Sequence, residues 1–123
     1  MSLVPDGLKY TKDHEWAKIE GAVATIGITD HAQRELGDIV FVELPKVGAT
    51  VAAGQSFGTI EAVKTVAELY APMSGTVEAV NTALAADAGV INQDPYGKGW
   101  IIKVKTSGSA EGLLDVAGYQ ALI

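Results

Sequence analysis

The chain has 123 residues, 48% of them apolar and 20% charged, which is typical of one soluble globular domain with a core of its own. Its net charge of −6 and its scattered basic residues argue against binding to nucleic acid or to an anionic membrane surface. The absence of cysteine excludes disulfides, a thiol nucleophile in the protein and cysteine-based zinc sites.

Strand-like segments predominate in the first half of the chain, and 14 glycines spread along the whole sequence favour short strands and turns. A turn at Gly21 joins the second and third of these strands into a β-hairpin. Asp30 is expected to cap a short helix over residues 29–37, with Gln33 in the capping-box position. The apolar run at residues 39–42 predicts a strand that is buried on both faces. The strands expected in this half are residues 8–11, 13–19, 22–28, 38–44 and 47–54.

The second half adds two alternating strands and a C-terminal helix. The strands are predicted at residues 76–81 and 100–105, and residues 92–99 between them are rich in turn formers. Residues 107–109 form a short linker with a candidate helix cap, and the helix is expected over residues 111–122. One side of that helix carries Leu113, Leu114, Ala117 and Ala121. The whole pattern indicates one mainly β domain without tandem repeats.

A single lysine, Lys64, lies in the middle of the apolar segment at residues 60–69. Local pattern favours a helix here, ended by Pro72, because four apolar residues recur at helical spacing: Ile60, Val63, Ala67 and Tyr70. The flanks favour a different structure, since Gly54 and Gly75 lie at nearly equal distances from the lysine and the two arms between them are similar. That near-symmetry suggests two matching strands with the lysine at the tip. Taken alone, the lysine reads as a solvated surface residue.

Six blocks of sequence decide between these readings. They are residues 8–11 with 14–16, 25–30 with 32–33, 36–45, 61–64, 70–72 with 74–75, and 94–97 with 99–100. In this order they resemble the H proteins of the glycine cleavage system, which are lipoyl carriers; Ala62 stands where that family commonly has Ser. The resemblance implies a barrel-sandwich hybrid of two facing β-sheets with short helices and a C-terminal helix. It also implies that Lys64 lies at an exposed hairpin tip rather than in a helix.

The resemblance further implies that Lys64 is joined by an amide to lipoic acid, which removes its charge and adds a long arm ending in a dithiolane. The implied partners are a pyridoxal-phosphate glycine decarboxylase, a tetrahydrofolate-dependent aminomethyltransferase, an FAD-dependent dihydrolipoyl dehydrogenase, and a lipoate ligase or lipoyltransferase. The carrier itself is expected to catalyse none of their reactions. No signal peptide, transit peptide or membrane span is recognisable, so residues 1–123 are expected to form one cytoplasmic domain, present as a monomer.

An aminomethyl group on the reduced arm would release formaldehyde in water, so shielding is expected to protect it. A carboxylate in a shielded groove would hold the protonated amine by a charge-assisted hydrogen bond. From the resemblance, Glu15 is the first candidate, with Asp13 and Glu68 as weaker ones. Glu35 stands where some relatives carry a groove histidine. Each carboxylate also has a bland interpretation as a solvated surface charge.

The surface around the tip is the expected contact for the lipoate ligase, with Glu61, Val63 and Glu68 as its candidates. Four alternatives stay open at this point: a protein that relays lipoate to other enzymes, a biotin carrier domain, a lipoyl domain of a 2-oxo acid dehydrogenase, and an enzyme with a Schiff-base lysine. Biotin carriers usually place Met on both sides of their lysine. A Schiff-base lysine must be desolvated. His14 and His31 are too few, and lack clustered partners, for a metal site.

Overall fold

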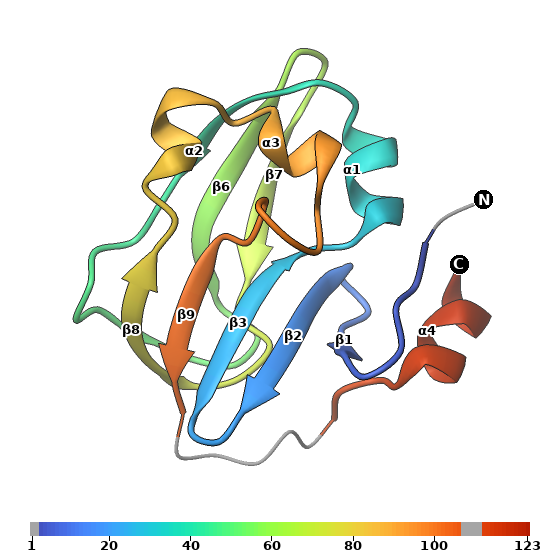
Figure 1. Cartoon of the computed structure of the whole chain (residues 1–123), viewed down its shortest axis with the longest axis vertical. Coiled ribbons are helices and arrows are strands. Elements are labelled where there is room, and N and C mark those ends of the chain that lie inside the picture. Colours follow the sequence, from blue (N-terminus) through green and yellow to red (C-terminus); the bar gives the residue numbers. More distant parts are fainter. Residues whose placement is uncertain (1–2, 107–111) are drawn as a thin grey trace.

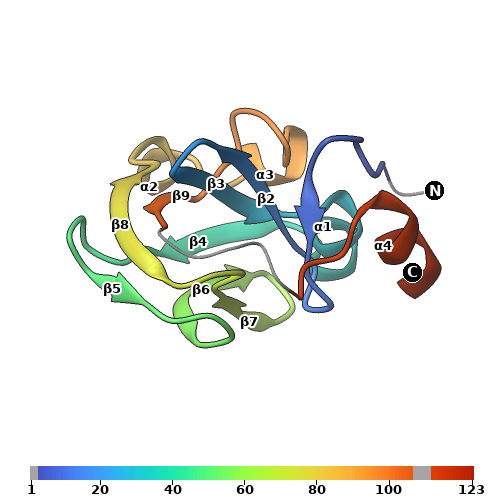
Figure 2. The same ribbon diagram turned by 90° about the horizontal axis from the view of Figure 1, so that it is seen from below.

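Strands dominate the computed structural model, which describes residues 3–106 and 112–123, and they form two antiparallel sheets that lie face to face (Figures 1 and 2). The larger sheet has the order β1-β2-β3-β9-β8-β5 and the smaller one the order β4-β6-β7. The strands of the larger sheet are β1 (Lys9–Tyr10), β2 (Glu15–Glu20), β3 (Val23–Ile28), β5 (Thr50–Val51), β8 (Gly75–Val80) and β9 (Ile102–Lys105). Those of the smaller are β4 (Ile39–Glu43), β6 (Ser56–Ala62) and β7 (Val66–Tyr70). The short helices are α1 (Asp30–Leu36), α2 (Ala83–Ala86), α3 (Val90–Gln93) and α4 (Val116–Leu122).

The core lies between the two sheets, because each sheet can bury an apolar face only against the other. Its fully buried side chains include Ile26, Ile60, Leu69, Ile102 and Val104. A second cluster, Tyr10, Trp16 and Tyr119, seals the side where α4 packs on β1 (Figure 1). The predicted mainly β fold with two facing sheets and a C-terminal helix is therefore confirmed. In the described part of the chain, none of the helices has the length and apolarity that a bilayer span requires.

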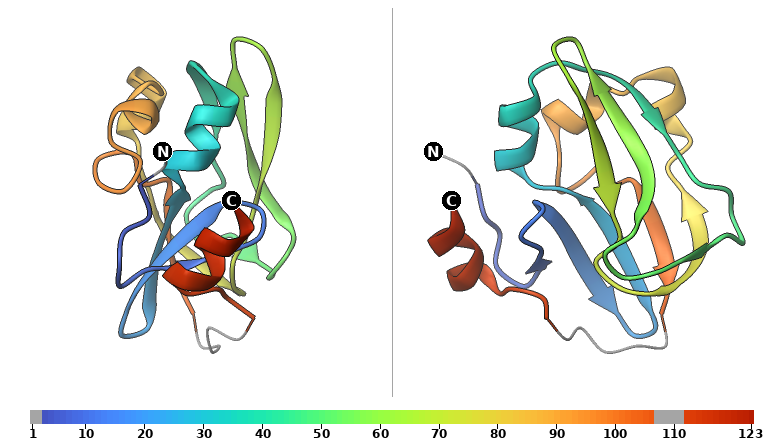
Figure 3. Two further views of the ribbon diagram at one scale, coloured as in Figure 1. Left: turned by 90° about the vertical axis from the view of Figure 1, so that its right-hand side faces the viewer. Right: turned by 180° about the vertical axis from the view of Figure 1, so that it is seen from behind.

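The segment around Lys64 is a β-hairpin, formed by β6 and β7, and the helix favoured by local pattern is wrong. The register pairs Glu61 with Val66 and Ile60 with Ala67, which leaves Lys64 in the turn. Tertiary packing overrides helix propensity here, because a strand places Ile60 and Leu69 in the core, where they are 0% and 2% exposed. The hairpin projects past α1 at one end of the molecule (Figures 1 and 3).

Strand β4 is buried on one face only, although its apolar run predicts burial on both faces. Val40 and Phe41 are 59% and 49% exposed, while Ile39 and Val42 are buried. A bulge between Ile39 and Phe41 shifts the register against β6, and β4 forms an edge of the smaller sheet. Only one face of this strand therefore meets the core. The strand expected at residues 47–54 is likewise reduced to the two residues of β5.

Helix boundaries differ from the prediction at both α1 and α4. Thr29, not Asp30, caps α1: its hydroxyl accepts a hydrogen bond from the Ala32 N–H at 3.2 Å. Helix α4 begins only at Val116, after its cap Asp115. Its buried residue is Tyr119, whereas the predicted inward residues Ala117 and Ala121 are exposed.

The remaining differences between the predicted and the observed secondary structure lie close to the helices. Leu114 lies before α4 and pairs with Tyr10 as a β-bridge, so it is not helical. The linker and cap expected at residues 107–109 lie outside the described residues. The small residues at 82–89 leave a loop and a weak turn of helix both open, and the structure forms α2 there, while α3 is not predicted.

Candidate functional site

Lys64 is exposed at the tip of the β6–β7 hairpin. The tip is closed by the Ala62 N–H, which donates to the Thr65 carbonyl at 2.8 Å. It is also tied to the segment after α1, because the Val63 N–H donates to the Asp38 carbonyl at 2.9 Å. A Cβ atom built on Gly37 would lie 3.5 Å from Cε of Lys64, so the lysine side chain passes close to the end of α1. The lysine is thus accessible to a partner, while backbone hydrogen bonds hold the turn that carries it.

A cavity of about 160 Å³ lies between α1, β7 and the segment before β2. All four carboxylates proposed from the sequence line it: Asp13, Glu15, Glu35 and Glu68. Apolar side chains such as Ile28 and Leu36 form the rest of its wall. The structure therefore brings together four acids that lie on three separate segments of the chain. Three of them are exposed, and Glu15 alone is buried.

Glu15 is only 2% exposed, which is unusual for a carboxyl group. The Thr11 hydroxyl donates to its Oε1 at 2.7 Å, and the Tyr70 N–H donates to its Oε2 at 3.3 Å. Within the described residues no cation pairs with it. Burial therefore prevails over the two hydrogen bonds and raises the pKa of Glu15 to about 7. Such a carboxyl would ionise readily once a cation entered the cavity.

His14 also lines this cavity, although sequence reasoning did not include it among the groove residues. It is the one non-glycine residue with a positive φ, 70°, in the described chain. Successive strand residues normally point to opposite faces, yet His14 and Glu15 face the same cavity. The only feature of the sequence that points to His14 as a groove residue is its position directly before Glu15. Its left-handed backbone conformation cannot be recognised from the residue type.

The three residues predicted to contact a ligase are all exposed: Glu61, Val63 and Glu68. Phe41, Glu61 and Val66 are register partners on three neighbouring strands, so their side chains form one exposed row below the tip. Glu68 also lines the cavity and accepts a hydrogen bond from the Tyr70 hydroxyl at 3.2 Å. No cluster of three or more His, Asp or Glu side chains suited to a metal ion occurs within the described part of the chain.

Comparison with known proteins places this arrangement in one family. The family model described as "Glycine cleavage H-protein" matches residues 8–123. A glycine cleavage system H protein from Rubrobacter xylanophilus is 59% identical over 107 residues, covering 87% of this chain and 85% of the relative. One from Carboxydothermus hydrogenoformans is 52% identical over all of this chain and 96% of the relative.

A solved structure gives the same answer for the fold. The crystal structure of a glycine cleavage system H protein from Mycobacterium marinum matches with a TM-score of 0.90 and 44% identity, covering 96% of this chain and 97% of that one. Sequence and structure therefore agree over nearly the whole length of the chain. The chain belongs to the glycine cleavage H-protein family.

Proposed function

We propose that this protein carries lipoate on Lys64 and serves the glycine cleavage system as its mobile carrier. The carrier role follows from membership of the H-protein family, and the choice of Lys64 is our inference. The observation that supports it is the position of this lysine, which is exposed at the tip of a hydrogen-bonded hairpin. A ligase and three enzymes can all reach such a tip, whereas a lysine on a sheet face would be hindered.

The residues near Lys64 fit a long arm with an apolar stem and a polar end. Strand β7 leads from the tip to the cavity, and Glu68 of this strand lies four residues beyond the lysine. The cavity offers apolar walls for the stem and Glu15 at its buried side. When bound, the lipoyl group would supply a disulfide: one sulfur would take the aminomethyl fragment of glycine as the S–S bond breaks and the other would become a thiol, and the dithiol left after the fragment departs would be reoxidised. Glu15 would hold the charged amine of this cargo, and the apolar walls would keep water from it.

The proposed partners are those that this chemistry requires. They are a pyridoxal-phosphate glycine decarboxylase, a tetrahydrofolate-dependent aminomethyltransferase, an FAD-dependent dihydrolipoyl dehydrogenase and a lipoate ligase or lipoyltransferase. The exposed row of Phe41, Glu61 and Val66, with Val63 at the tip, is the surface we assign to the ligase. A Schiff-base enzyme is disfavoured, because an exposed Lys64 is not desolvated.

The modification is tested by intact mass and peptide mapping of the protein from lipoate-supplied cells. We expect one lipoyl group, on the peptide that contains Lys64, because the other lysines do not lie at this hairpin tip. Biotin on that peptide, or no modification when a lipoate ligase is present, would refute the proposal.

The role of Glu15 is tested with the loaded protein. We expect Glu15→Ala to release formaldehyde faster than the wild type, by about tenfold, since it removes a charge-assisted hydrogen bond worth about 1.5 kcal/mol. Glu78→Ala is the matched control, because Glu78 is exposed, does not line the cavity and lies outside the surface assigned to the ligase. Equal rates in the wild type and Glu15→Ala would remove Glu15 from the arm's binding site and leave the lipoylation of Lys64 untouched.

A further inference from the structure

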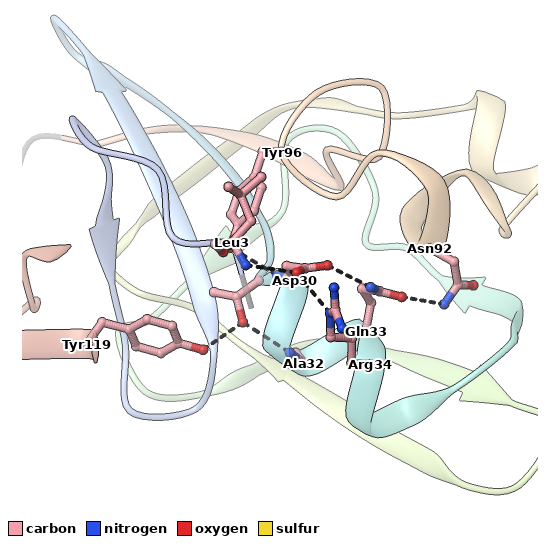
Figure 4. A network of polar contacts seen from close by, with 9 residues as sticks. Leu3, Asp30, Ala32, Gln33, Arg34, Asn92, Tyr96 and Tyr119 are labelled. Atoms are coloured by element: carbon pink, nitrogen blue, oxygen red, sulfur yellow. Dashed lines mark hydrogen bonds and ion pairs between the residues drawn. The ribbon is translucent and has the colours of Figure 1, made fainter. Parts of the chain in front are cut away.

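Tyr119 of α4 points its hydroxyl at the N-terminal end of α1 (Figure 4). Its side chain is fully buried and its ring stacks on Tyr10, with centroids 4.8 Å apart. Its hydroxyl lies 2.7 Å from Oγ1 of Thr29 and 2.7 Å from Nδ1 of His14. The C-terminal helix therefore touches a residue of the cavity wall through one hydroxyl group.

The supply of donors and acceptors fixes the direction of this hydrogen-bonded chain. Oγ1 of the buried Thr29 already accepts a hydrogen bond from the Ala32 N–H. The hydroxyl proton of Thr29 also needs an acceptor, and among the described residues the Tyr119 oxygen is the one within hydrogen-bond distance. The Tyr119 proton must then go to Nδ1 of His14, which can accept it only when that nitrogen is unprotonated. The reverse direction would leave the buried Thr29 hydroxyl without an acceptor, which costs free energy. The chain thus runs from Thr29 to Tyr119 to His14.

The backbone of His14 holds its ring in this place. The His14 N–H donates to the Thr11 carbonyl, and its carbonyl accepts from the Thr29 N–H. The left-handed conformation between these two bonds is costly for a side chain with a Cβ atom, and such strain is concentrated at functional sites. Both His14 and its partner in the chain are therefore held by surrounding structure rather than free to reorient.

We propose that Tyr119 is a positioning residue that keeps His14 neutral, with its proton on Nε2, in the wall of the cavity that receives the arm. The assignment of that cavity rests on the proposed function. A neutral His14 neither repels the charged amine of the cargo nor competes with it for Glu15. An imidazolium at the same place would do both.

Of the other groups around His14, those that lower its pKa outweigh those that raise it. His31 of α1 lies with its ring 4.8 Å away and its Nε2 3.6 Å from Oε1 of Glu35. Burial, followed by His31, lowers the pKa of His14, whereas Asp13 and Glu35 raise it to a smaller extent.

The proposal is tested first on the unmodified protein, by ¹⁵N NMR of the imidazole rings. In the wild type we expect His14 to show a proton on Nε2 and none on Nδ1. In Tyr119→Phe the cost of reversing the chain disappears, so we expect the pKa of His14 to rise by about half a unit or more. Tyr10→Phe is the control, since it makes the same change on the stacked ring but outside the chain. A proton on Nδ1 in the wild type, or an equal pKa in all three proteins, would overturn the proposal.

The second test uses the loaded carrier. We expect Tyr119→Phe to release formaldehyde about threefold to tenfold faster than Tyr10→Phe, the effect of one hydrogen bond. Release at the same rate in both variants would overturn the link between His14 and the cargo, even if the NMR result stood. The NMR test needs no lipoyl group, so it keeps its meaning if Lys64 proves not to be the modified residue.

Discussion

Lys64→Arg should abolish lipoylation, so that the variant keeps its unmodified mass in cells supplied with lipoate. Arginine retains the positive charge and much of the length, but its guanidinium stays protonated and cannot attack an activated acyl group. Because Lys64 is exposed and the turn is closed by backbone bonds of its neighbours, the fold should be unaffected. We expect the free energy of unfolding to change by no more than about 0.5 kcal/mol. The measurement is intact mass together with chemical denaturation.

Lys46→Arg is the matched control, because Lys46 is an exposed lysine in the loop that follows β4. It should take up the lipoyl group as the wild type does. A lipoyl mass increment that persists in Lys64→Arg would show that another lysine is the acceptor. Loss of the increment in both variants would point to a general effect on the ligase rather than to the tip.

The resemblance of six ordered blocks predicted more of the site than any local pattern did. The spacing of Ile60, Val63, Ala67 and Tyr70 favours a helix, but a residue's burial in a two-sheet core depends on strands that are distant in sequence. Ile60 is fully buried while Val63 is 75% exposed, whereas helical spacing would place both side chains on the same buried face. Sequence order carries information about the whole fold, and local periodicity does not.

Smaller differences have the same kind of cause. The bulge after Ile39 turns Phe41 outward, and an apolar run alone cannot reveal a bulge. At α1 two adjacent capping residues compete: Thr29 takes the cap, and Asp30 instead accepts from Gln33 and Arg34. The inward turn of His14 depends on a left-handed backbone that its residue type does not disclose. The cavity acids were foreseen as candidates, but only the structure singles out Glu15 as the buried one.

Glu15→Gln should make the unmodified protein more stable at pH 8 and change it little at pH 5. The pKa of Glu15 is raised from 4.5 to about 7 in the folded protein, mainly by burial. Between these values the unfolded chain has lost the proton while the folded chain still holds it. The carboxyl's contribution to stability is therefore fully present below pH 4.5 and is lost as the pH rises through 7. The loss amounts to as much as about 3 kcal/mol at pH 8.

Glutamine mimics the protonated acid, and the Thr11 hydroxyl can turn to accept from its amide, so the variant should lack this loss. The check is urea denaturation at both pH values for the wild type, Glu15→Gln and the exposed control Glu61→Gln. A pH dependence that is the same in all three proteins would contradict the raised pKa. If Glu15→Gln is the more stable protein and also the faster to release formaldehyde, the buried carboxyl weakens the fold at neutral pH and protects the cargo. Such a cost to stability is what a residue retained for its chemistry should show.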